Sequence, residues 1–260
     1  MLPALALAIL SPAYSFSPIE KLTYHVQVTF EGFIPVLGGQ TGVVQVDLGL
    51  DVLGAKADGD AQLAAVSELS AFKIQFNGAT LPFTLENVQG YFPKNTVQIT
   101  RSGKVLRTDA PDVQLPVRLP GLDAKRFPDI TFLPVEFPEG PLTIGKTFQY
   151  RKNFGGSDAF YDVTPVAVKD DVLELDIRMK QEYEVLEDDA VNVVQDEKDA
   201  VARVSTKLSG TGKAFFDLVK GRLDRMEVGA VADSTAVEIR SGKSSLRKLK
   251  TTLKVDLKKP

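Results

Sequence analysis

The amino-acid sequence predicts an all-β protein of antiparallel, strongly curved sheets, in a half-barrel or sandwich-like arrangement. Three observations lead to this prediction: long stretches alternate apolar and polar residues, helical periodicity is scarce, and a proline-rich apolar segment divides the chain in two. The chain has 260 residues and no cysteine, so disulfides and thiolate chemistry are excluded and an apolar core must hold the fold.

Period-two alternation indicates strands with one buried and one wet face. It is clear in residues 22–30, 173–185 and 249–257, where the opposite phase is polar or charged. A parallel sheet covered on both sides would show continuous apolar runs instead, so we expect antiparallel pairing. The apolar positions of the first of these strands are Leu22, Tyr24, Val26, Val28 and Phe30.

Prolines mark the clearest boundary in the chain. They recur through residues 111–141, where they remove ladder donors and stop helices, although residues 121–127 could form one helical turn. The same segment is too apolar to be a solvated linker, so we expect an extended strap lying against a sheet. The mature chain therefore divides into an N-terminal β-half (residues 16–110), the strap (residues 111–141) and a C-terminal β-half (residues 142–260).

The first fifteen residues differ from the rest of the chain. MLPALALAIL is apolar and too short to span a bilayer, and small residues at Ala13 and Ser15 suit a signal-peptidase site. This pattern predicts a signal peptide, residues 1–15, cleaved after Ser15, and hence a periplasmic or extracellular protein. The alternative is a short buried N-terminal helix or strand. No other apolar run is long enough to span a membrane, and the lack of cysteine excludes a bacterial lipoprotein anchor.

Gly210-Thr211-Gly212-Lys213 invites comparison with a phosphate-binding loop. The full motif needs a glycine where Lys207 stands and a hydroxyl residue where Ala214 stands. The apolar phase also runs through both glycines without a break, so we expect them inside a strand. Glycine there would allow a bend, a close approach of another backbone, or a ligand lying on bare backbone. Gly210, Gly212 and Phe216 are therefore the candidate ligand-binding residues.

The stretch after this strand predicts a hairpin. A four-residue loop at residues 218–221 would use Gly221 as its left-handed residue and set Asp217 opposite Arg222 and Phe216 opposite Leu223. The apolar phase changes beyond Leu223. A bulge near Asp224 or Arg225 would restore it.

The remaining chemistry-bearing residues suggest no catalytic or metal site. His25 is the single histidine and lies on the polar phase of a strand. The acidic run at residues 187–199 lacks the spacing of a cation loop and fits a solvated hairpin tip. We therefore predict no cofactor and no metal, and a net charge of −3 predicts no nucleic-acid partner. A basic tail could dock an anionic polymer or lipid headgroup, or simply protect an edge strand from aggregation: Arg240, Lys243, Arg247, Lys248, Lys250, Lys254, Lys258 and Lys259.

Three stretches of the C-terminal half, FPEGPLTIGKTFQY, YDVTPVAVKDDVLELDIRMKQ and GTGKAFFDLVKGRLDRMEVGA, resemble a group of exported bacterial β-proteins known only as a domain of unknown function. That group has a Val-Gly-Asp-x-Trp-like strand start, a Gly-x-Gly strand, an Asp-x-x-x-Gly turn and a long return strand. Here Lys146 replaces the acid and Phe148 the tryptophan. The resemblance implies an exported antiparallel β fold and brings no catalytic residues.

These observations together suggest a non-enzymatic envelope protein. Its curved sheet would bind an apolar or amphiphilic ligand, such as a lipid, or another envelope protein, in the manner of periplasmic lipoprotein carriers whose concave side is open. The alternative is a hydrolase of envelope polysaccharide that uses two carboxylates facing each other across a cleft.

Overall fold

A computed structural model describes residues 10–35, 38–111, 125–154 and 156–258. These residues form one open antiparallel sheet of 13 strands. The strand order along the sheet is β6-β5-β3-β2-β1-β13-β12-β11-β9-β8-β7, and the short strands β4 and β10 pair with β3 and β9. Strands of both predicted halves join in this sheet, because β1 pairs with β13. The all-β, antiparallel prediction is confirmed.

The strands differ greatly in length, and the longest lie in the middle of the sheet. Their bounds are β1 (Leu22–Ile34), β2 (Gln40–Ala55), β3 (Leu63–Phe76), β4 (Ala79–Thr80), β5 (Asn95–Ile99), β6 (Val105–Thr108), β7 (Phe148–Phe154), β8 (Ser157–Lys169), β9 (Val172–Glu187), β10 (Val193–Val194), β11 (Ala202–Asp217), β12 (Arg222–Glu238) and β13 (Ser244–Leu257). Short helices are α1 (Leu85–Gln89), α2 (Phe127–Ile130) and the 3₁₀ turn η2 (Glu197–Asp199).

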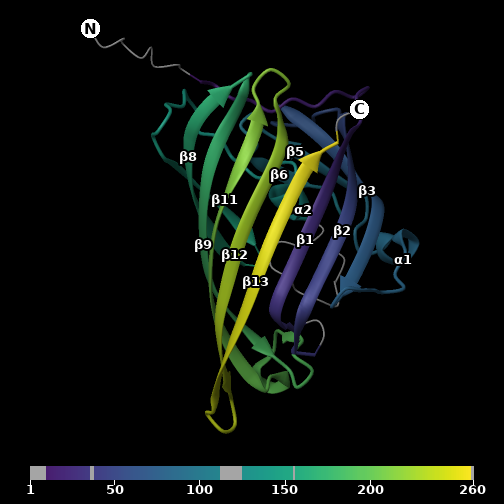
Figure 1. The fold of residues 1–260 in the computed structure, drawn as a ribbon, viewed down its shortest axis with the longest axis vertical. Coiled ribbons are helices and arrows are strands. Elements are labelled where there is room, and N and C mark those ends of the chain that lie inside the picture. Colours follow the sequence, from purple (N-terminus) through teal and green to yellow (C-terminus); the bar gives the residue numbers. More distant parts are fainter. Residues whose placement is uncertain (1–9, 36–37, 112–124, 155, 259–260) are drawn as a thin grey trace.

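The alternation seen in the sequence sets the two faces of the sheet. Along β1 the residues Leu22, Tyr24, Val26, Val28 and Phe30 are all buried, while the residues between them are half-buried. In Figure 1 the sheet curls so that β5 and β6 lie behind β1 and β13, with α2 in the enclosed space. We call the face toward α2 the inner face and the opposite one the outer face.

The predicted hairpin between β11 and β12 is present in detail. Phe216 pairs with Leu223 and Asp217 with Arg222, and Gly221 has a φ of 63°. The register then shifts so that Phe215 faces Arg225, which leaves Asp224 as the extra residue of a bulge. Both glycines, at positions 210 and 212, lie inside β11 as expected.

Two segments of the chain fill the inner face at one end of the molecule. We call this the upper end, since it holds the hairpin turns β8–β9 and β11–β12 at the top of Figure 1. Tyr14 from the N-terminal segment and Phe132, Leu133 and Val135 from the strap are each at most 1% exposed. Packed aromatic rings hold the segments to β11, with the Tyr14 and Phe137 centroids each 5.0 Å from that of Phe216.

The strap therefore packs against the sheet as predicted. At the upper end the concave side of the sheet is filled by these segments and is not open. No strand occurs within residues 125–141, in agreement with the proline content. The helical turn expected at residues 121–127 lies slightly later, because the observed helix α2 starts only at Phe127. Pro128 explains this position, since proline is tolerated in the first turn of a helix. Residues 121–124 lie outside the described residues.

A buried ion pair fixes the strap to the sheet edge. Lys152 of β7 points inward, and its Nζ lies 2.9 Å from Asp129 Oδ1; both side chains are about 5% exposed or less. The ammonium also donates to the carbonyl oxygens of Asp129 and Leu133, at 3.2 Å and 2.6 Å. All three ammonium donors thus have acceptors, which is the condition for tolerating a buried charge.

The N-terminal segment is an integral part of this core. The Tyr14 hydroxyl donates to Val135 O at 3.0 Å, and the amide of Ser15 donates to Gly221 O at 2.8 Å. A chain cleaved after Ser15 would lose the Tyr14 contacts. The alternative of a buried N-terminal helix or strand holds only in part, because Tyr14 is buried but residues 11–15 form neither a helix nor a strand. Cleavage itself stays a prediction. In the part of the chain that the structure describes, no helix is long and apolar enough to cross a membrane.

Candidate functional site

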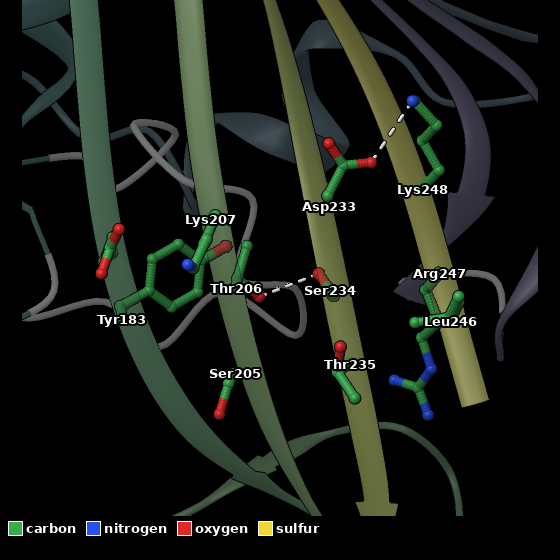
Figure 2. Close-up of a pocket in the computed structure, with 11 residues that line it drawn as sticks. Tyr183, Ser205, Thr206, Lys207, Asp233, Ser234, Thr235, Leu246, Arg247 and Lys248 are labelled. Carbon is green, nitrogen blue, oxygen red and sulfur yellow. Dashed lines mark hydrogen bonds and ion pairs between the residues drawn. The ribbon is translucent and has the colours of Figure 1, made fainter. Parts of the chain in front are cut away.

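The other end of the sheet, which we call the lower end, carries a hollow of about 720 Å³. The strands β9, β11, β12 and β13 extend there beyond the rest of the sheet (Figure 1). Volumes of roughly 300 to 1,000 Å³ are typical of sites for small ligands. Figure 2 shows its lining residues: Glu182, Tyr183, Ser205, Thr206, Lys207, Asp233, Ser234, Thr235, Leu246, Arg247 and Lys248.

Strand phase places the opening of the hollow on the outer face. Two cross-strand rows of outward residues line it, whereas only one inward row contributes, Tyr183, Thr206, Ser234 and Arg247. An opening on the inner face would instead be lined by neighbouring inward residues such as Leu208 and Leu249, which it is not.

The first outward row is a ladder of alternating charge across four strands. The register sets Glu182 opposite Lys207, Lys207 opposite Asp233, and Asp233 opposite Lys248. Asp233 and Lys248 form an ion pair at 3.3 Å, while the Lys207 and Glu182 side chains have no ion-pair partner among the described residues. One cation and one anion therefore remain available to a ligand.

The second outward row supplies hydroxyl groups and an apolar contact. Ser205 pairs with Thr235, and Thr235 pairs with Leu246. The Leu246 side chain is 86% exposed, which is unusual for a large aliphatic group on a regular strand. The hollow thus offers a polar side and an apolar side to the same ligand.

The inward row has polar side chains, which lie on the opposite face of the sheet from the opening of the hollow. Thr206 and Ser234 share a hydroxyl hydrogen bond of 2.8 Å. Arg247 bonds Glu187 at 2.5 Å, and its guanidinium lies 4.5 Å from the centre of the Phe33 ring. Burial raises the pKa of the Tyr183 hydroxyl, which therefore stays protonated near neutral pH.

None of the three candidate ligand-binding residues lines this hollow, whereas Arg247 and Lys248 of the basic tail do. Phe216 is 1% exposed in the aromatic core. A Cβ at Gly212 would overlap the Glu227 carbonyl oxygen of β12, and one at Gly210 would lie 2.9 Å from Met179 Cγ and 3.1 Å from Ala230 Cβ. Both glycines thus allow close strand packing, which supports the packing interpretation over the ligand one. Ligand binding at these three residues stays a prediction.

The remaining candidates lie apart from one another. His25 lies on the outward phase of β1, with Nε2 3.6 Å from Asp47 Oδ1. The acidic run forms the connection from β9 to β11, where Asp188 accepts hydrogen bonds from the Asn192 side-chain amide and from backbone amides, which lower its pKa. Within residues 10–35, 38–111, 125–154 and 156–258, no three side chains gather as ligands for a metal ion.

Only partial signals for the hollow are present in the sequence. Lys207 and Ser205 stand on the polar phase of their strand, and Lys248 belongs to the basic tail, but neither pattern distinguishes them from other surface residues. Their grouping with Glu182 and Asp233 depends on the register of four strands, which alternation alone does not determine.

Comparison with known proteins does not identify a family for this chain. No protein-family model matches the chain, and no curated protein sequence matches it. The resemblance to exported β-proteins of unknown function stays a prediction.

Proposed function

We propose that this protein is a non-enzymatic binding protein of a bacterial envelope, which holds an amphiphilic ligand in the outer hollow. The observation that carries the proposal is the lining of a ligand-sized space by Lys207 and Glu182, which form no ion pair with a described residue, on one side and by the exposed Leu246 on the other. A polar head would lie against Lys207 and Glu182, and the apolar part of the ligand against Leu246.

The inner face is the weaker candidate for this role. Its upper part is occupied by the chain itself, and the second hollow, beside Phe92 and Phe127, measures only about 10 Å³. A lipid carrier needs an apolar space of a few hundred cubic ångströms, which neither the filled upper part nor this second hollow provides among the described residues.

The hydrolase alternative has a pair of carboxylates to consider but not the required geometry. Glu182 and Asp233 both line the hollow, on β9 and β12. Both side chains extend from one face of the sheet, with Lys207 between them. Two carboxylates that cleave a glycosidic bond must instead flank the substrate from opposite sides.

Native mass spectrometry of the protein purified from its own cell envelope tests the proposal. We expect a bound species that disappears in Leu246→Ser and in Lys207→Glu. The double variant Ile19→Ser/Val219→Ser is the matched control, because it removes equally exposed aliphatic side chains at the upper end. An empty wild-type spectrum, or a ligand retained by both hollow variants, would overturn the proposal. Polysaccharide cleavage abolished by Glu182→Gln would establish the hydrolase instead.

A further inference from the structure

Two rows of alternating charge cross the outer face of the strands β9, β11, β12 and β13. The strand register defines both rows. In strand order, the row at the lower end, which we call the lower ladder, consists of Glu182, Lys207, Asp233 and Lys248. The row nearer the upper end, which we call the upper ladder, consists of Asp176, Lys213, Glu227 and Lys254.

The two ladders differ in how far their charges are paired within the chain. In the upper ladder both lysines form ion pairs, Lys213 with Glu174 at 2.5 Å and Lys254 with Glu227 at 3.1 Å. In the lower ladder Asp233 and Lys248 pair at 3.3 Å, and both side chains are more than 60% exposed. Lys207 and Glu182 have no ion-pair partner among the described residues. The lower ladder thus keeps charges available to a second molecule.

Exposed aliphatic side chains continue the lower ladder toward the tip of the sheet. Leu246 follows Lys248 on the outward phase of β13 and is 86% exposed, and Val237 follows Asp233 on the outward phase of β12. Ile239 N donates to Val201 O at 2.9 Å, so these two residues lie side by side just past the ends of β12 and β11. Apolar side chains grouped beside charged ones are typical of a protein–protein contact.

The charge order makes the lower ladder complementary to itself. From β9 to β13 its signs are negative, positive, negative, positive, so a reversed copy offers the opposite sign at every strand. A twofold axis parallel to the strands, between β11 and β12, sets Glu182 against Lys248 of the second copy. It also sets Lys207 against Asp233 of the second copy, and symmetry forms each contact twice. A twofold axis across the strands would instead set each charge against itself.

We propose that two copies of this chain associate face to face through the lower ladder, about the axis parallel to the strands. Leu246 then lies over β9 of the second copy, where the outward residues are Glu184 and Leu186. Strands about 4.8 Å apart and outward rows about 7 Å apart give a contact of roughly 400 Å² on each copy. That area fits a weak, reversible dimer. The dimer does not require a ligand and so goes beyond the proposed function, although the second copy would cover the hollow.

Sedimentation velocity of the full chain at about 1 to 100 µM, the range of a weak dimer, tests the proposal. We expect the dimer fraction of the wild type to rise with concentration. Lys207→Glu and Asp233→Lys should each weaken association about tenfold or more, because each variant sets like charges together twice. An equimolar mixture of the two variants should associate again, since every contact in the mixed dimer joins opposite charges. The matched control is Lys213→Glu in the upper ladder, which should associate like the wild type.

Four outcomes would overturn the dimer. These are a wild type that stays monomeric, undiminished association of both single variants, an equal loss in Lys213→Glu, or a mixture that associates no better than its components. Circular dichroism of each variant checks that the sheet is retained. Sedimentation reports the dimer and native mass spectrometry reports the ligand. A ligand-free dimer would therefore overturn only the proposed function, and a monomer that carries ligand would overturn only the dimer.

Discussion

The upper and lower parts of the strands β9, β11, β12 and β13 have the same alternation of inward and outward residues, but their inward side chains differ in kind. Along the inward phase of β11, Phe216 lies at the upper end, Gly212 and Gly210 in the middle, and Thr206 at the lower end. Phe216 packs against rings of the N-terminal segment and the strap, whereas Thr206 bonds the hydroxyl of Ser234. The two ends of this phase thus differ in the size and polarity of their inward side chains, although residues at both ends are buried.

This difference explains where stability and binding are expected to lie. The upper part buries large aromatic groups, and such burial contributes most of the favourable free energy of folding. The lower part has a polar inward row and leaves its outer face free for the hollow. Variants in the two parts should therefore differ in kind: loss of stability above and loss of ligand below.

The largest effect is expected from truncating the N-terminal aromatic anchor. Tyr14→Ala should lower the free energy of unfolding by about 3 to 5 kcal/mol, because a fully buried ring and its hydrogen bond to Val135 are lost. Tyr183→Ala, at a half-buried site below, should cost less than about 2 kcal/mol. Urea unfolding followed by circular dichroism measures both. Equal costs would show that the two parts are packed alike.

Breaking the buried ion pair of the strap should come next. Lys152→Met should cost about 3 kcal/mol, since it leaves Asp129 charged and buried. The cost lies at the low end for such pairs because Arg126 remains 3.4 Å from that carboxylate. The double variant Lys152→Met/Asp129→Asn should be no less stable than Lys152→Met alone in the same urea experiment. A clearly less stable double variant would show that the two side chains act independently.

Much of the fold could be predicted from the sequence. Strand phase determined the faces of β1, β9 and β13. The change of phase beyond Leu223 predicted a bulge near Asp224 or Arg225, which the structure places at Asp224. Prolines together with apolar residues indicated that the strap packs against the sheet. These features are local, so the chain itself carries the information.

The candidate site depended on contacts that local pattern does not contain. Tyr14 follows an apolar stretch, and that pattern predicts a signal peptide that includes it, although its ring lies in the core. No local pattern singles out Lys152, because only the tertiary fold brings Asp129 to it. The hollow required the register of four strands, in which Lys207 lies between two carboxylates.

The smallest effect is expected at the glycines between the two parts. Gly212→Ala should cost about 1 to 3 kcal/mol, because the added methyl group would overlap the backbone of β12 at Glu227 and Val228. Gly229 in the neighbouring strand has open space at its Cβ position, so Gly229→Ala should be neutral or slightly stabilising by about 0.4 to 1 kcal/mol. Both are measured as shifts of the urea midpoint.

The sign of the Gly212 result decides between the two interpretations of this strand. If Gly212→Ala is destabilised and Gly229→Ala is not, the close approach of the strands requires glycine at position 212. Tight backbone packing then joins the upper, aromatic part of the sheet to its lower, polar part. If Gly212→Ala is tolerated, strand packing does not require a glycine at this position. Bare backbone on the inner face would then be best explained by a ligand, and the binding site would have to be sought on the inner face, away from the outer hollow.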